Sequence, residues 1–171
     1  MRVLQWAPLM AIIGLSSTVR AGDIDKSNQL LATAIKNVRG TLEDGLKASE
    51  RVGKPISAKF AVDHGAVHLS LSIAKHDGFS EVILYPAIRM VTEIVEVTDA
   101  AKIKIAMEQN LAMERTSVSL LSATENAVKA NDGFRAVSIF PTLEEGHPIA
   151  VVTLLGNGEF KTVTEELDLI D

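Results

Sequence analysis

The sequence predicts an α+β fold made of two tandem repeats, each with helices packed on an antiparallel β-sheet. Residue types recur between the two halves, each half passes from helical periodicity to strand alternation, and Asp-Gly or Asn-Gly turns separate strands. The recurring residues lie 75 to 81 positions apart: Thr41, Leu46, Ala48 and Glu50 with Thr116, Leu121, Ala123 and Glu125, then Ala58 with Ala136, Gly65 with Gly146, and Gly78 with Gly158. We therefore expect residues 22–98 and 99–171 to be one unit used twice.

Two helices are expected at the start of the first repeat. The apolar residues of 30–38 fall on one helical face, and Gly40 follows as a stop signal. Thr41 and Asp44 have the spacing of a capping box, which predicts the start of the second helix. Gly45 inside that helix costs about 1 kcal/mol relative to alanine, so either packing compensates or the helix is kinked there.

The second repeat is expected to begin with helices that open at Asp99 and Thr116. Strands follow the helices in both repeats, because apolar and polar residues alternate there with a period of two. The predicted strands are residues 56–62, 67–73, 82–85, 90–97, 134–140, 149–155 and 159–164.

Two dipeptides, Asp77-Gly78 and Asn157-Gly158, are typical of tight hairpin turns, in which both central residues have φ > 0. They predict antiparallel sheets, which can leave one face in water. The polar side chains expected on that wet face are those of His68, Ser70, Ser72 and Thr153.

Residues 1–21 have the layout of a secretory signal peptide. Arg2 supplies the positive start, Leu4 to Leu15 form the apolar run, and Val19 and Ala21 are the small residues before the cut. The apolar run has about 12 residues, whereas a membrane-spanning helix needs about 20. We therefore expect a periplasmic or secreted protein without stable membrane insertion after cleavage.

The charge balance is acidic, with a formal net charge of −5 for the whole chain. Loss of Arg2 and Arg20 with the leader would make it −7. Nucleic-acid binding needs clustered Lys and Arg to neutralise phosphates, so it is not expected. The chain has no cysteine, which excludes disulfides and a thiol nucleophile.

The residues that could carry chemistry are scattered. His64 and His68, beside Asp63, are the weak candidates for a metal site, but in an extended chain they would lie about 13 Å apart. The nucleophile motif G-x-S-x-G does not occur in the sequence. We expect no enzymatic activity, no catalytic residues and no cofactor.

Two A-x-E helices, in "LKASE" at 46–50 and "LSATE" at 121–125, each precede a glycine and a run of alternating strands at 56–84 or 134–164. This pattern resembles the PepSY domain over about 40–97 and 116–169. The resemblance implies a small helix-on-sheet module that binds or inhibits peptidases in the cell envelope, and it offers no catalytic residues. The chain departs from the family's V-D-x-x-T-G-x-V hairpin, since Tyr85 stands at the aspartate position.

The sequence therefore favours an exported, non-enzymatic protein-binding module that inhibits or modulates a peptidase of the cell envelope. The mechanism would be strand addition or surface complementarity. The alternative is a periplasmic accessory of a sensing system that binds a metal or another ligand, with His64 and His68 as its weak candidate ligands.

Overall fold

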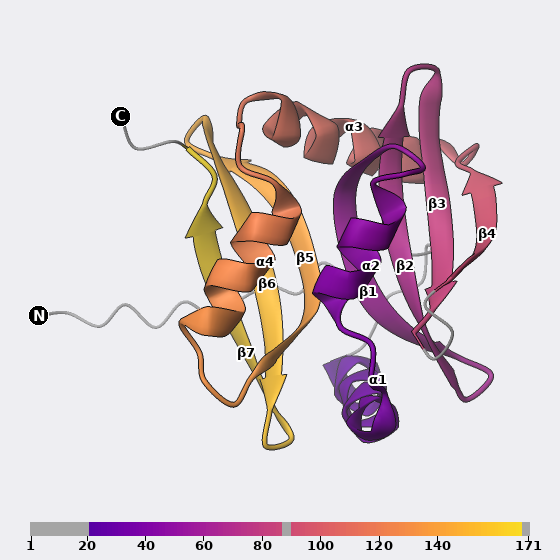
Figure 1. The fold of residues 1–171 in the computed structure, drawn as a ribbon, viewed down its shortest axis with the longest axis vertical. Helices are drawn as coiled ribbons and strands as arrows, with labels where there is room; N and C mark the ends of the chain where they lie inside the picture. The colour runs from indigo at the N-terminus through magenta and orange to yellow at the C-terminus, as the bar shows by residue number, and fades with distance from the viewer. Residues whose placement is uncertain (1–20, 87–89, 169–171) are drawn as a thin grey trace, which may run out of the picture.

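The computed structural model describes residues 21–86 and 90–168 (Figure 1). The predicted signal peptide lies outside the described residues, apart from Ala21, with which the first helix begins. None of the described helices combines the length and apolar character needed to cross a membrane. The elements in chain order are α1 (Ala21–Ala34), a 3₁₀ turn η1 (Ile35–Asn37), α2 (Leu42–Ser49), β1 (Lys54–Asp63), β2 (Ala66–Lys75), β3 (Gly78–Tyr85), β4 (Met90–Glu96), α3 (Ala100–Glu114), α4 (Leu120–Lys129), β5 (Arg135–Glu144), β6 (His147–Gly156) and β7 (Glu159–Glu166).

The seven strands form one antiparallel sheet in the order β4-β3-β2-β1-β5-β6-β7. The prediction of an α+β fold with antiparallel strands is confirmed. The strands of both predicted halves belong to the same sheet, because β1 pairs with β5 through Ala58↔Ile139 and Lys59↔Ser138.

Helices cover both faces of the sheet. α2 and α4 contact each other and lie side by side on one face, while α3 crosses the upper end behind the strands (Figure 1). Lys102 of α3 reaches Glu81, whose side chain points away from the buried Val82 beside it, so α3 packs on the face opposite α2 and α4. The core between the sheet and α2 and α4 contains Leu42, Leu46, Ala58, Leu69, Leu71, Val82, Leu120, Ile139, Val152 and Leu154.

The expectation of a wet second face is wrong for two of its four side chains. Ser70 and Thr153 are only 7% and 5% exposed. On this side of the sheet α3 packs across β2, β1, β5 and β6, and Ser70 and Thr153 on these strands are buried. His68 and Ser72 remain partly exposed.

The predicted helices occur in the expected parts of the chain, but some of their ends differ from the prediction. Thr41 caps α2 with a complete capping box, and Asp99 caps α3. α1 ends at Ala34 and passes into η1, so Gly40 lies beyond the helix end. The prediction that Thr116 opens the last helix is wrong, because Ser119 is the cap of α4.

Gly45 lies within the single helix α2, where it allows a close approach to the sheet. A Cβ atom at this position would lie 2.7 Å from Cδ1 of the fully buried Leu69. Packing therefore compensates for the low helix propensity of glycine.

The β1–β2 and β5–β6 hairpins are built alike, with four strands of ten residues. Both carry a β-bulge, between Pro55 and Ser57 in β1 and between Ala136 and Ser138 in β5. The two turn residues have positive φ in both: 47° at His64 and 81° at Gly65, then 50° at Glu145 and 88° at Gly146. Bulges and turns thus recur at a constant spacing of 81 residues.

The same spacing extends to β3 and β7, and it corrects one predicted turn. Lys75 pairs with Gly78, and Gly156 pairs with Glu159, 81 residues further on. The first of these turns is therefore His76-Asp77 rather than Asp77-Gly78. The turn at Asn157-Gly158 is confirmed, with φ of 53° and 82°.

The helices correspond at a spacing of 78 residues. Thr41 and Ser119 are the caps of α2 and α4. The buried residues follow the same spacing: Leu42, Gly45, Leu46 and Ser49 in α2, and Leu120, Ala123, Thr124 and Ala127 in α4. The spacing of 75 inferred from identical residue types is therefore three residues short for these helices, and in the strands Ala58 corresponds to Ile139 rather than Ala136.

The first residues of β1 and β5 bind helix ends of the opposite half. Arg135 donates to the carbonyl oxygens of Ile35, Val38 and Gly40 at 3.3, 3.0 and 2.5 Å. Lys54, 81 residues earlier, donates from Nζ to the carbonyl of Met113 at 2.7 Å. Lys54 thus satisfies a carbonyl at the C-terminal end of α3, where carbonyls have no partner within the helix. Arg135 binds carbonyls of η1 and of the loop that leads to α2, so both cations link the two halves.

We predict that Arg135→Ala lowers the free energy of unfolding by about 2–3 kcal/mol, because a charged donor is removed from partly buried carbonyls. Lys54→Ala should cost about 1 kcal/mol, because one hydrogen bond is lost. Urea unfolding followed by circular dichroism measures both values. Equal costs for the two variants would contradict this account of the helix ends.

Candidate functional site

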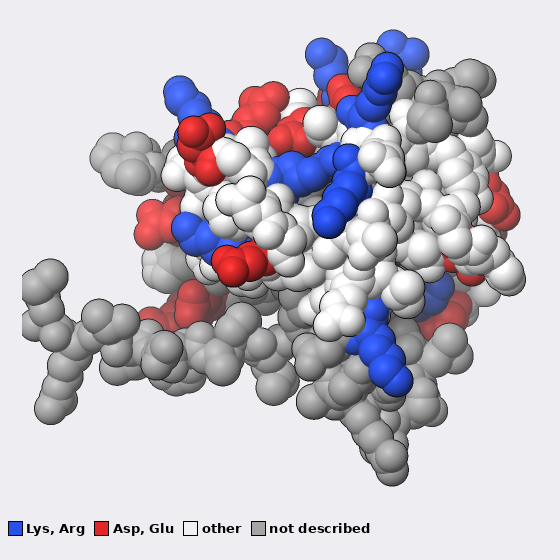
Figure 2. All heavy atoms as spheres, turned by 90° about the horizontal axis from the view of Figure 1, so that it is seen from below, with Lys and Arg blue, Asp and Glu red and all other residues white. Residues whose placement is uncertain are grey.

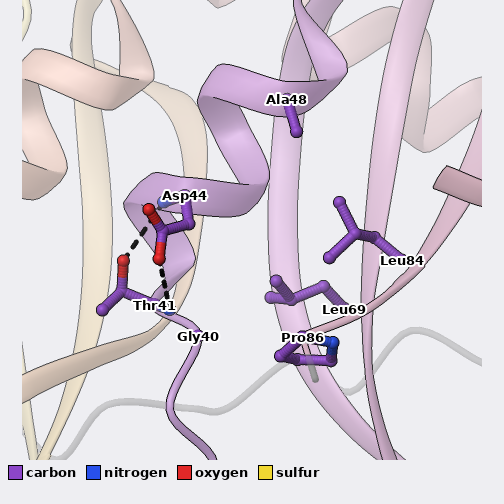
Figure 3. Close-up of a pocket in the computed structure, with 7 residues that line it drawn as sticks. All are labelled: Gly40, Thr41, Asp44, Ala48, Leu69, Leu84 and Pro86. Atoms are coloured by element: carbon purple, nitrogen blue, oxygen red, sulfur yellow. Dashed lines mark hydrogen bonds between the residues drawn. The ribbon is translucent and has the colours of Figure 1, made fainter. Parts of the chain in front are cut away.

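The pocket beside α2 is small, with a volume of about 70 Å³, and its polar side chains are engaged (Figure 3). Asp44 N–H donates to Thr41 Oγ1 at 3.1 Å, and Thr41 N–H donates to Asp44 Oδ2 at 3.3 Å. The remaining wall includes Leu69, Leu84 and Pro86. The hydroxyl and the carboxylate are thus committed to capping the helix.

A larger pocket of about 240 Å³ lies where α2, the end of α3 and the start of α4 meet. Several of its polar groups also have structural partners. Lys54 binds the carbonyl of Met113, Thr116 Oγ1 donates to the carbonyl of Leu167, and Ser119 Oγ accepts from the Ser122 N–H. These contacts hold helix ends and loops in place.

The structure does not bring the candidate metal ligands together. His64 is a turn residue, 94% exposed, with Nδ1 2.8 Å from Oδ1 of Asp63. His68 lies on β2, where its ring packs against Tyr85 with centroids 6.1 Å apart. The backbone reverses direction at His64, so the two histidines do not lie on one extended strand. In residues 21–86 and 90–168 no group of three His, Asp or Glu side chains could hold a metal ion.

A polar cluster that the sequence patterns did not indicate joins α3 to the sheet. Ser70 Oγ donates to Glu81 Oε1 at 2.6 Å, and Lys102 Nζ lies 3.4 Å from Glu81 Oε2. Burial raises the pKa of Glu81, but the Ser70 hydrogen bond and the charges of Lys102 and Lys59 outweigh it, so the net pKa is lowered. The Glu81 carboxylate is therefore ionised and accepts hydrogen bonds from Ser70 and Lys102, which links α3 to the sheet.

The two free edges of the sheet differ in character. Four of the eight β7 residues are charged: Glu159, Lys161, Glu165 and Glu166. On β4, by contrast, Ile94 and Val95 are 49% and 43% exposed, and Tyr85 at the end of neighbouring β3 is 40% exposed. Charged residues protect an edge from pairing with another strand, whereas exposed apolar residues favour it.

The backbone of β4 offers hydrogen-bonding groups along its open side. Val97 N–H donates to the carbonyl of Phe79 in β3 at 2.9 Å. Because an antiparallel strand turns alternate residues to alternate sides, Val95 and Glu93 also face β3, in register with Glu81 and Ile83. Ile94 and Glu96 therefore direct their N–H and C=O groups away from the sheet.

Sequence reasoning placed the β4 strand but did not identify it as an edge. The available signal was the pair Ile94-Val95, since two consecutive apolar residues on a strand point to opposite faces.

The lower end of the molecule has a different character, with Lys, Arg, Asp and Glu side chains mixed among uncharged residues (Figure 2). The outer side of β4, with which no other strand of the described residues pairs, is accordingly the candidate functional site.

We predict that Glu81→Gln lowers the free energy of unfolding by about 1 kcal/mol at pH 7, because the ionic partner of Lys102 is lost. A carboxyl group whose pKa is lowered on folding stabilises above its unfolded pKa, near 4.5, and this stabilisation is lost as the pH falls through the folded value. The difference between wild type and variant should therefore shrink in urea unfolding between pH 6 and pH 3. The exposed Glu93→Gln is the control, and a constant difference at Glu81 would refute the assignment.

Comparisons of the chain with protein-family models, with curated proteins and with solved structures find no match.

Proposed function

We propose that this chain is an exported, non-enzymatic protein-binding module that takes up a strand of its partner at the β4 edge. One observation carries the proposal: β4 ends the sheet with Ile94 and Val95 exposed on opposite faces. In strand addition, main-chain hydrogen bonds supply affinity and alternate side chains supply specificity. The outward N–H and C=O groups of Ile94 and Glu96 can form the main-chain hydrogen bonds, and the exposed side chains can supply the specificity.

The proposal includes an origin by duplication, in which two PepSY-like units share one sheet. The constant spacings of 78 residues in α2 and α4 and of 81 residues in the strands support it. The reciprocal contacts of Lys54 and Arg135 support it independently, because each cation binds a helix end in the other half. Under this proposal β4 is an addition to the first unit, which places it at the outer edge.

The proposed partner is an exported peptidase, as the PepSY resemblance implies. Several polar groups in the two pockets are already engaged in capping and loop contacts, which favours binding over catalysis. A metal-binding role receives less support, because His64 is a solvent-exposed turn residue and His68 packs on Tyr85.

We predict that the full mature chain binds or slows at least one member of a panel of exported metallopeptidases at micromolar concentration. Val95→Lys should abolish that effect, because it places a charge on the pairing edge. Thr164→Lys on β7 is the matched control and should leave binding unchanged. Inhibition kinetics and biolayer interferometry provide the two measurements.

Two results would count against this function. If no peptidase is bound or slowed, the peptidase partner is excluded. If Val95→Lys and Thr164→Lys both bind as the wild type does, the β4 edge is not the site.

A further inference from the structure

We infer that the segment added at β4 carries two basic side chains that flank two apolar ones. This inference rests on the proposed function and names the chemistry of the partner. It follows from the four residues Glu93 to Glu96, which pair regularly with Ser80 to Ile83 of β3. Beyond them the register shifts between Ile83 and Leu84, so the regular part of the edge is four residues long.

Each face of this short edge offers one carboxylate and one apolar side chain. Glu93 and Val95 point to the side of Glu81, and Ile94 and Glu96 point to the side of Val82. Directly opposite residues on neighbouring strands have Cβ atoms about 5 Å apart, where opposite charges attract and like charges repel. The complementary strand therefore reads basic, apolar, apolar, basic, and this pattern is the same in either chain direction.

The two carboxylates are available for such a partner. Glu93 and Glu96 are exposed and form no ion pair within the described part of the chain, whereas Glu81 beside them is already paired with Lys102. The β4 strand has two acidic and no basic residues. Among the described residues, the edge thus presents negative charge without an ion-pair partner around an apolar centre.

A second copy of the chain fits this edge less well than a basic segment does. If two β4 strands paired about a twofold axis at Ile94, each Glu93 would face a Val95 and no carboxylate would meet a basic group. Such a dimer would also join two acidic chains, each with a formal charge of −5. Charge complementarity therefore favours a partner of opposite charge.

The test uses two capped hexapeptides, Thr-Lys-Val-Val-Lys-Thr and Thr-Glu-Val-Val-Glu-Thr, titrated into the ¹⁵N-labelled mature chain. We expect the basic peptide to bind at least about tenfold more tightly than the acidic one, since two opposed charge pairs change sign. The amide signals of Ile94 and Glu96 should shift most. Their hydrogen exchange should also slow.

Two variants make the test specific. The double variant Glu93→Lys/Glu96→Lys should reverse the preference between the two peptides, and its exposed positions leave the core unaltered. Ile94→Pro should abolish binding of both, because it removes an outward N–H while sparing the hydrogen bonds to β3. Circular dichroism confirms that each variant is folded.

The inference is overturned if the basic peptide does not bind at millimolar concentration, if both peptides bind equally, or if the shifts lie away from β4. Dimerisation through β4 that the basic peptide cannot displace would assign the edge to a second copy instead. If a peptidase binds the charge-reversed variant as well as the wild type but loses Val95→Lys, the proposed function stands and the basic pattern fails. If the peptides are discriminated as expected but no peptidase binds, the basic pattern stands and the peptidase partner is excluded.

Discussion

The pairing of β1 with β5 is the contact on which the rest of the structure depends. Each half contributes three consecutive antiparallel strands, β1–β3 or β5–β7, and the first half adds β4. A unit of about 60 residues has only a marginal core of its own. The pairing of Ala58 with Ile139 and of Lys59 with Ser138 joins the two groups of strands into one continuous sheet. The same contact buries what would otherwise be two further open edges, so the only edges left in the described sheet are β4 and β7.

The helices depend on this junction as well. Arg135 begins β5 but binds the chain that follows α1, and Lys54 begins β1 but binds the end of α3. Each half therefore positions a helix end of the other. Burial lowers the pKa of Arg135, with the nearby Glu43 acting in the opposite direction, and its guanidinium lies 5.3 Å from the centroid of the Phe60 ring. The residues of both halves thus belong to one hydrophobic core and one sheet.

In a sheet joined at its centre in this way, unpaired strand edges remain only at the periphery of the described sheet. Polar side chains at the helix ends and beneath α3 have structural partners: Thr41 and Ser119 cap helices, and Glu81 links α3 to the sheet. The β4 edge is different, because its backbone groups and two apolar side chains face outward, and its carboxylates have no ion-pair partner in the part of the chain that the structure describes. The proposed activity therefore rests on main-chain pairing and charge complementarity at one edge of the sheet.

The sequence by itself determined the local features of this protein. Periodicity placed the strands, and side-chain chemistry placed the caps at Thr41 and Asp99 and the turn at Asn157-Gly158. These features depend on residues within one turn or one hairpin, so local sequence carries them. The tertiary structure alone decided that the strands form one sheet, that α3 buries Ser70 and Thr153, and that β4 is an edge. Strand partners and register are set by contacts between residues far apart in the chain, which residue patterns within one segment do not encode.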